Sequence, residues 1–325
     1  MVTVIIPCYN RPEDLRNALN SLAAQTNKEF SVLVSDDAST EDTESVAKSF
    51  ENILDITYIK KEKNGGIGAN RQTALEKVFE LNPEYIMWLD SDDSLMPNAI
   101  QRLLLAIQNN KADIIATDIL CESNMPNQKI IKADSSVTWL HGKIYCTEYL
   151  KNIGIKFPQV STNEDLGFNL VAFGKTNEIW YLNEIFYLWR NNENSITRSK
   201  AMTEHQRRCG STDYIETLYF AFNNLEKFKP NVVGSIVHLY NYYERGLIYK
   251  TIEPKHEKML QRMLHNRQIL DTIVALNEYQ GKLELDQWVT MGSNMIFFPH
   301  SYGIWISKFI TKEEVEVAIR RRQKK

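Results

Sequence analysis

Apolar and amphipathic segments alternate along the first third of the chain. The apolar segments are short, continuous and rich in β-branched residues, which is typical of parallel strands buried on both faces. They cover residues 2–6, 30–34, 56–60 and 85–89. The segments between them have helical spacing and cover residues 12–25, 39–50, 69–80 and 97–109. This alternation predicts an α/β fold with a doubly wound, mostly parallel sheet and right-handed crossovers.

The pattern changes in the second third of the chain. Residues 113–121 and 129–133 resemble two strands joined as a hairpin rather than through a crossover. The helices expected in the rest of the chain cover 147–152, 164–172, 205–223, 232–249 and 254–279. We therefore expect two domains, with the sheet in residues 1–200 and a mainly helical C-terminal lobe in residues 201–325.

The charges of the chain nearly balance. Its 38 Lys and Arg stand against 41 Asp and Glu, which gives a net charge of −3. Bulk electrostatics therefore do not indicate nucleic acid or an anionic membrane as an obligatory partner. The basic residues 320–325 are interpreted as a solvated helix end, where cations are favourable. A weak anchor to an acidic membrane surface is the alternative.

The cysteines bear on the compartment. The four cysteines are widely spaced and match no zinc or redox pattern, which indicates free thiols in a reducing compartment. No apolar run is long enough to span a bilayer, and the N-terminus enters a strand almost at once instead of forming a signal peptide. We expect a cytoplasmic protein that can also work peripherally at the inner face of a membrane.

A cluster of carboxylates follows the fourth expected strand. The run Asp90-Ser91-Asp92-Asp93 places three like charges within four residues, at the strand end where α/β sheets bind ligands. Such an oxygen-rich cluster suits Mg²⁺ or Mn²⁺ held together with substrate phosphates. A solvated acidic turn before the helix that starts near Pro97 is the alternative interpretation.

Polar and aromatic residues also follow the first two strands. Asp36-Asp37 comes after the second strand, and Pro7-Cys8-Tyr9-Asn10 follows the first. An Asp accepts from a base N–H and a ring stacks on the base, so this edge can bind a nucleotide diphosphate. Residues 64–68 (NGGIG) are neither a dinucleotide fingerprint nor a P-loop, and alone indicate only a tight turn.

Four sequence blocks carry a family resemblance. They are residues 4–10 (VIIPCYN), 34–39 (VSDDAS), 64–71 (NGGIGANR) and 89–93 (LDSDD). Together and in this order they resemble the family 2 glycosyltransferases of the GT-A fold, over roughly residues 1–200. The resemblance implies a nucleotide-sugar donor, a divalent metal and inversion at the anomeric carbon.

The resemblance also implies roles for single residues near the donor. Pro7 and Tyr9 would line the base pocket, and Asp37 would read the uracil edge. Asp90 would contact the ribose or the donor sugar, and Asp92 would ligate Mn²⁺ or Mg²⁺.

Three arginines are candidates for binding the nucleotide-sugar donor. By resemblance, Arg71 would lie beside the donor. Arg190 and Arg198 could each meet the diphosphate, a task that suits a guanidinium group. Surface ion pairs are the alternative interpretation of Arg190 and Arg198.

An inverting transfer also requires a general base for the acceptor hydroxyl. The pair Glu164-Asp165 opens an apolar helix and matches the Glu-Asp pair of the family, whose Asp is the base. We therefore expect Asp165 to be the base and Glu164 to support it on the acceptor side. An acid that interacts with the helix dipole is the alternative. His141 lies where the family places acceptor-side residues, or is a satisfied loop histidine.

The sequence thus predicts an inverting, metal-dependent glycosyltransferase that uses a UDP-sugar and an acceptor hydroxyl. By analogy with the family, a saccharide of an envelope, a capsule or a lipid-linked chain of polysaccharide biosynthesis is the expected acceptor. A protein, a small molecule and a modified nucleic-acid base are the alternatives, of which the nucleic acid is not favoured. A non-catalytic sugar-nucleotide-binding or scaffold protein is the alternative from another class. A nucleotidyltransferase is disfavoured because residues 7–12 (PCYNRP) stand where such enzymes carry a Gly-rich loop. The oligomeric state stays open.

Overall fold

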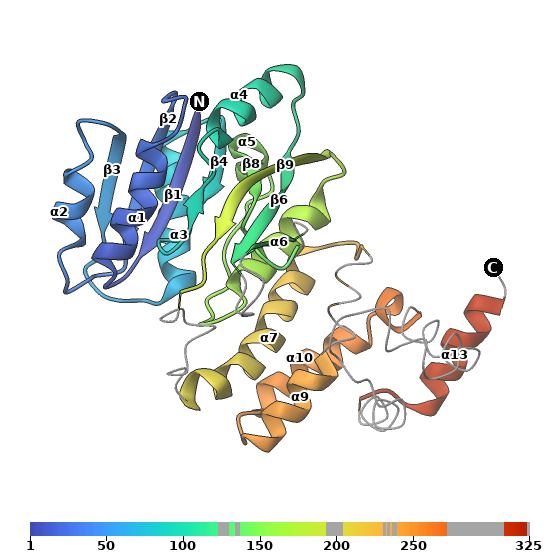
Figure 1. The fold of residues 1–325 in the computed structure, drawn as a ribbon. Helices are drawn as coiled ribbons and strands as arrows, with labels where there is room; N and C mark the ends of the chain where they lie inside the picture. Colours follow the sequence, from blue (N-terminus) through green and yellow to red (C-terminus); the bar gives the residue numbers. More distant parts are fainter. Residues whose placement is uncertain are drawn as a thin grey trace. The chain divides into compact units, whose positions relative to one another are not determined.

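The computed structural model describes residues 1–122, 130–133, 137–192, 204–229, 232, 235, 239–271 and 309–323. The chain divides into two compact units, Met1–Arg207 and Arg208–Lys325. Figure 1 shows the sheet in the first unit and helices in the second.

The first unit is built on a sheet that comprises nine strands within the described residues. The strands are β1 (Val2–Cys8), β2 (Phe30–Asp36), β3 (Asp55–Lys60), β4 (Tyr85–Trp88), β5 (Ser94–Leu95), β6 (Ile114–Glu122), β7 (Ile130–Ala133), β8 (Lys143–Cys146) and β9 (Ile179–Trp189). Their order is β3-β2-β1-β4-β8-β6-β9-β5, and β7 pairs with β6 (Figure 1).

The two halves of this sheet differ in strand direction. Strands β1 to β4 are parallel to their neighbours in order β3-β2-β1-β4. Strand β8 is antiparallel to β4 and β6, and β5 is antiparallel to β9. The α/β fold class is confirmed, and so is the antiparallel pairing of the expected hairpin, β6 with β7. The sheet is mixed, because β5, β7 and β8 run against the parallel half.

Helices join and cover the strands of the first unit. They are α1 (Pro12–Ala23), α2 (Thr43–Lys48), α3 (Ile67–Leu81), α4 (Ala99–Asn109), α5 (Thr147–Asn152) and α6 (Glu164–Lys175). Helix α1 has Pro12 in its first turn and buries Leu15, Ala18, Leu19 and Leu22 on one face, as the periodicity predicts. Strand β1 is buried along its whole length, which is expected of a central strand with both faces covered.

Helix α2 begins later than the sequence predicts. Residues Ser39 and Thr40 do not open the helix, because their backbone N–H groups donate to the side chains of Asp36 and Asn10. The helix begins after Asp42, whose carboxylate accepts from the backbone N–H of Ser45. Polar residues after β2 therefore form the turn at the sheet edge, and this turn belongs to the candidate site.

The second unit is helical where it is described. Its helices are α7 (Glu204–Asn224), which starts just before the unit boundary, α9 (Leu239–Ile248), α10 (Pro254–Leu264) and α13 (Lys312–Gln323). Helices α9 and α10 lie within segments expected to be helical, and α7 extends the expected segment by one residue at each end. Residues 272–279 lie outside the described part. Its core includes Ile215, Leu218 and Leu260, each with no exposed surface. Among the described helices, none combines the length and apolar character needed to cross a bilayer.

Candidate active site

The carboxyl ends of the parallel strands meet at one edge of the sheet. Cys8 at the end of β1 pairs with Asp36 at the end of β2, and β4 lies on the other side of β1. The segments that follow these strands therefore bring the expected site residues to one edge.

Arg71 connects two acidic segments at this edge. It lies on α3 with 5% of its surface exposed. One guanidinium nitrogen donates to Asp90 Oδ1 at 2.7 Å, and the other donates to Glu164 Oε1 at the start of α6. Burial raises the pKa of Glu164 to about 7 although Arg71 acts against this shift. Arg71 therefore ties the expected metal loop to the helix that carries the expected base.

Asp90 lies between two cationic or potentially cationic groups. His141 places Nε2 at 3.2 Å from Asp90 Oδ2, opposite the oxygen that binds Arg71. Burial disfavours the charged carboxylate, but Arg71 and His141 outweigh it and hold the pKa of Asp90 well below its ordinary value. His141 also stacks on the Tyr187 ring, with centroids 4.6 Å apart. The structure thus places His141 against the acidic loop.

Asp93 is an internal anchor of the acidic loop. Its side chain is 2% exposed. Tyr187 donates its hydroxyl to Asp93 Oδ2 at 2.5 Å, and the backbone N–H of Arg190 donates to Asp93 Oδ1 at 2.8 Å. Burial raises the pKa of Asp93 to about 7. These contacts fasten the end of β9 to the loop, while the Arg190 side chain stays partly exposed and Arg198 lies outside the described residues.

Asp92 is more accessible than Asp93 and is paired differently. Its side chain is 18% exposed, and Arg11 Nη1 donates to its Oδ2 at 3.0 Å. The side-chain amide of Asn192 donates to the same oxygen at 3.2 Å. Burial and the neighbouring Asp90 raise the pKa of Asp92, and Arg11 acts against this.

One group of these residues has the spacing that suits a divalent cation. Asp90, Asp93 and His141 each offer a ligand atom, and these atoms lie within 4.8 Å of one another. Carboxylate oxygen is the donor type that Mg²⁺ and Mn²⁺ prefer. The side chain of Asp93 is 2% exposed, whereas those of Asp92 and Asp90 are 18% and 27% exposed, so Asp92 and Asp90 are the more accessible carboxylates for a cation that also binds a ligand from solvent.

Asp165 and Glu164 occupy the first turn of α6. Asp165 is partly exposed, whereas Glu164 is buried. Asp165 Oδ1 accepts from the backbone N–H of Leu166 at 2.7 Å. Burial raises the pKa of Asp165, although Arg71 nearby acts in the opposite direction. Of this pair, Asp165 is the carboxylate that a substrate can reach.

The region expected to hold the nucleobase of the donor contains an organised loop. Tyr9 is 44% exposed and Pro7 is buried within β1. Asp37 accepts from Lys61 Nζ at 2.6 Å and from the backbone N–H of Gly66 at 2.7 Å. Gly66 has φ +82°, a conformation that favours glycine, at the start of α3. Asp37 thus holds the loop after β3 in this structure.

Sequence reasoning assigned no role to Lys143, a lysine on β8 with no exposed surface. Its ammonium group donates to the backbone carbonyl of Trp139 and faces that of His141 at 3.4 Å. Asn169 of α6 donates to the same Trp139 carbonyl at 2.8 Å. Burial lowers the pKa of Lys143 to about 7. Lys143 and Asn169 therefore hold the turn that presents His141. The sequence signal that could have indicated this role of Lys143 is a single Lys next to the apolar residues 144–146.

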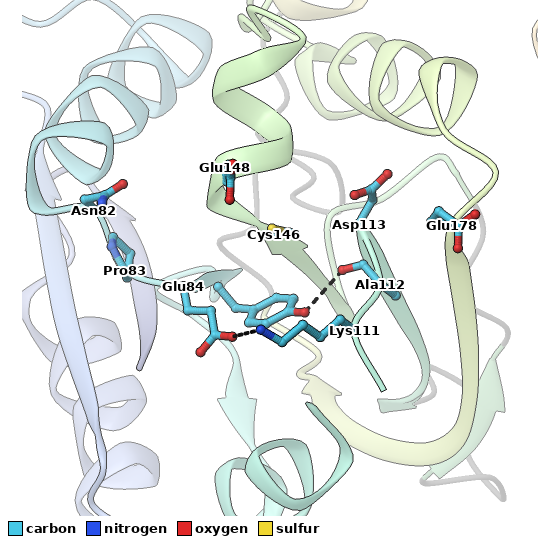
Figure 2. A pocket seen from close by; sticks show the side chains of 10 residues that line it. Asn82, Pro83, Glu84, Lys111, Ala112, Asp113, Cys146, Glu148 and Glu178 are labelled. Carbon is cyan, nitrogen blue, oxygen red and sulfur yellow. Dashed lines mark hydrogen bonds and ion pairs between the residues drawn. The ribbon is translucent and has the colours of Figure 1, made fainter. Parts of the chain in front are cut away.

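A separate hollow lies at the opposite edge of the sheet (Figure 2). Its volume is about 400 Å³, and it lies at the start of β4 and the end of the antiparallel β8. Its charged lining residues are Glu84, Lys111, Asp113, Glu148 and Glu178. Figure 2 shows Lys111 beside Glu84, with nitrogen and oxygen 3.9 Å apart. The hollow is thus separate from the site at the carboxyl edge.

Comparison with known proteins identifies the class. The model of the family described as glycosyl transferase family 2 matches residues 3–158. Residues 3–158 are thus a domain of glycosyltransferase family 2, as predicted from the four sequence blocks.

The relatives agree with this class. Poly(ribitol-phosphate) beta-N-acetylglucosaminyltransferase TarS of Staphylococcus aureus is 28% identical over 202 residues, which cover 58% of this chain and 35% of TarS. The chain therefore spans about a third of the length of TarS. The structure of TarS 1–349 in complex with UDP-GlcNAc has a TM-score of 0.61 at 20% identity, covering 85% of this chain and 83% of the TarS chain. Mannosyltransferase PcManGT from Pyrobaculum calidifontis, in complex with GDP-Man and Mn²⁺, has a TM-score of 0.51 at 14% identity, covering 98% and 86%. Both structures show the fold alone.

Proposed function

We propose that the chain is an inverting, metal-dependent glycosyltransferase that moves a sugar from a UDP-sugar to an acceptor hydroxyl. The observation that carries the proposal is the Arg71 bridge between Asp90 and Glu164. It fixes the acidic loop after β4 and the first turn of α6 in one network. A donor diphosphate beside the loop and an acceptor beside α6 would then lie next to each other.

The donor side is assigned from exposure and from charge. We assign Asp92 as the metal ligand and Asp90 as the residue that contacts the ribose or donor sugar. A bound divalent ion, Mn²⁺ or Mg²⁺, would neutralise charge on the leaving diphosphate. Tyr9 supplies an exposed ring for the base, and Arg190 supplies a cation near the diphosphate. UDP is favoured because TarS has been crystallised with UDP-GlcNAc and with UDP.

The acceptor side is assigned to α6. The Asp165 carboxylate takes the proton of the acceptor hydroxyl while that oxygen attacks the anomeric carbon. The bond from this carbon to the diphosphate oxygen breaks, and the nucleoside diphosphate leaves. Raising the pKa of Asp165 above that of an ordinary Asp makes its ionised form a stronger base. Glu164 is held by Arg71 and supports Asp165 in position.

The acceptor class follows from the relative. TarS is named for transfer to poly(ribitol-phosphate). We propose that the acceptor here is likewise a hydroxyl of an envelope polymer, made at the cytoplasmic side of a membrane.

The test is a donor panel followed by one substitution. UDP-, GDP- and TDP-sugars are incubated with the protein and Mn²⁺ or Mg²⁺, and release of nucleoside diphosphate is measured. We expect metal-dependent release from a UDP-sugar. Asp165→Asn should lower turnover at least about 100-fold, while calorimetry shows donor binding within a few-fold of the unsubstituted protein. Glu178→Gln, at the opposite edge, is the matched control and should turn over normally.

Two results would contradict the proposal. Normal turnover of Asp165→Asn would remove the base assignment. Metal-dependent donor binding by the unsubstituted protein, without hydrolysis or transfer to any envelope-polymer acceptor, would instead indicate a non-catalytic sugar-nucleotide-binding protein.

A further inference from the structure

Arg11 occupies one carboxylate oxygen of Asp92, the expected metal ligand. It donates through Nη1 to Asp92 Oδ2 at 3.0 Å, and the same nitrogen lies 3.8 Å from Asp14 Oδ2. The side chains of Arg11 and Asp92 are 22% and 18% exposed, so the pair is shielded from solvent without being sealed. Such a pair is stronger than a fully exposed one, and still reachable by a ligand.

The backbone at Arg11 is fixed by the turn that precedes α1. Asn10 adopts φ +50°, and its backbone N–H donates to Ser39 Oγ at 2.8 Å. The carbonyl of Arg11 accepts from the backbone N–H of Leu15 at 3.0 Å, which begins the helix. The long side chain can therefore change partners while its Cα stays in place.

The contact on Asp92 conflicts with metal binding. Asp92 Oδ2 already accepts from Arg11 and from Asn192. Lone pairs used by two N–H donors are not available to a cation at the same oxygen. A guanidinium group and a divalent ion on the same carboxylate also repel each other. Metal binding through this oxygen therefore requires Arg11 to leave.

We propose that Arg11 competes with the divalent ion for Asp92 and thereby makes metal binding depend on the donor. This inference rests on the proposed function. When the cation takes Asp92, the guanidinium group moves to the donor diphosphate, an anion that matches its fork of N–H donors. Without a donor, Asp14 is the nearby carboxylate left to receive it, and it is shared with Asn192 at 3.1 Å. The ion and the donor then bind more tightly together than either binds alone.

Calorimetry with Mn²⁺ tests this competition without any turnover. Mn²⁺ is titrated into the protein alone and into the protein saturated with UDP, for the unsubstituted chain and for Arg11→Met. We expect Arg11→Met to bind Mn²⁺ alone roughly three- to tenfold more tightly, as loss of a partly exposed ion pair allows. The same variant should bind UDP in the presence of Mn²⁺ several-fold more weakly. Arg11→Lys keeps the charge but loses the fork of N–H donors, so its Mn²⁺ and UDP affinities should lie between those of the unsubstituted chain and those of Arg11→Met.

The matched control is Arg16→Met, on the helix α1 that Arg11 precedes. Arg16 is 43% exposed and pairs with Glu13, so its Mn²⁺ and UDP affinities should equal those of the unsubstituted chain. Unchanged Mn²⁺ affinity in both Arg11 variants, with the fold verified by circular dichroism, would overturn the inference and leave the proposed function standing. If the unsubstituted chain binds no Mn²⁺ even with UDP, the inference and the metal dependence of the proposed function both fall.

Discussion

The two edges of the sheet are both acidic, but their charged groups are paired differently. At the carboxyl edge, Asp90 and Glu164 are joined by the buried Arg71. At the amino edge, Glu148 and Glu178 line an open hollow and are exposed (Figure 2). The number of carboxylates does not distinguish the two edges. The two edges differ in whether the charged groups are buried together with their counter-charges.

The difference has an energetic meaning. An exposed carboxylate remains hydrated and contributes little to stability. A buried carboxylate is destabilising unless a partner and hydrogen bonds compensate for lost water. The carboxyl edge therefore holds its charged groups in a fixed geometry, which is what stabilisation of a developing charge requires. Substitutions on either edge test this difference.

The largest effect is expected from Arg71→Met. Removing the guanidinium group leaves Glu164 buried and uncompensated and takes one partner from Asp90. We expect the free energy of unfolding to fall by about 3 kcal/mol or more and transfer to be lost. Urea unfolding followed by tryptophan fluorescence measures the first effect, and the donor assay measures the second.

Two further variants make the Arg71 result specific. The double variant Arg71→Met with Glu164→Gln should recover part of the stability, because a neutral amide is less costly to bury than an uncompensated carboxylate. Arg102→Met removes a guanidinium group that is 47% exposed, against 6% for Arg71, and should change the free energy of unfolding by less than about 1 kcal/mol. Equal effects of Arg71→Met and Arg102→Met would show that burial does not distinguish the carboxyl edge.

Much of the carboxyl edge was predictable from the sequence. Periodicity predicts parallel strands, and residues that follow such strands lie at one edge of the sheet. The sequence alone therefore predicts that Asp37, Asp90 and Asp92 lie in one region, where the structure places them. The pair Glu164-Asp165 was identified by its resemblance to the Glu-Asp pair of the family, and the structure places it at the helix start that the sequence predicts. Their chemical roles remain predictions.

The cations and supporting residues were harder to predict. Arg71 was expected beside the donor, and its bridging contacts depend on α6, nearly a hundred positions later in the sequence. Tyr187 lies on β9, a strand that was not predicted because its residues are mostly half-buried. Lys143 lies on a four-residue strand between a turn and a helix. Such long-range contacts leave no local periodic signal.

An intermediate effect is expected from Lys143→Met, and it depends on pH. Burial lowers the pKa of Lys143 to about 7 from 10.5. Between these values the unfolded chain binds a proton at this amine and the folded chain does not, so the unsubstituted protein gains stability as pH rises. The difference in free energy of unfolding, unsubstituted protein minus Lys143→Met, should therefore increase by about 1 to 2 kcal/mol from pH 7 to pH 9. Urea unfolding at several pH values measures this difference.

The control for Lys143 comes from the other edge. Lys111→Met removes an amine that is 84% exposed, so the difference between this variant and the unsubstituted chain should be independent of pH in the same range. A pH-independent difference for Lys143→Met as well would mean that the Lys143 amine stays charged in the folded protein.

The smallest effect is expected from Glu148→Gln at the amino edge. Glu148 is an exposed residue of α5 that lines the hollow, so neutralising it should change the free energy of unfolding by no more than about 0.5 kcal/mol. Transfer should also be unchanged, because the hollow and the acidic loop lie at opposite ends of β4. A tenfold loss of transfer would contradict the separation of the two edges and indicate that charge at the hollow acts on the site. If transfer persists in Glu148→Gln while Arg71→Met abolishes it, the reaction does not require the exposed carboxylate at the amino edge. It then requires the buried guanidinium group at the carboxyl edge.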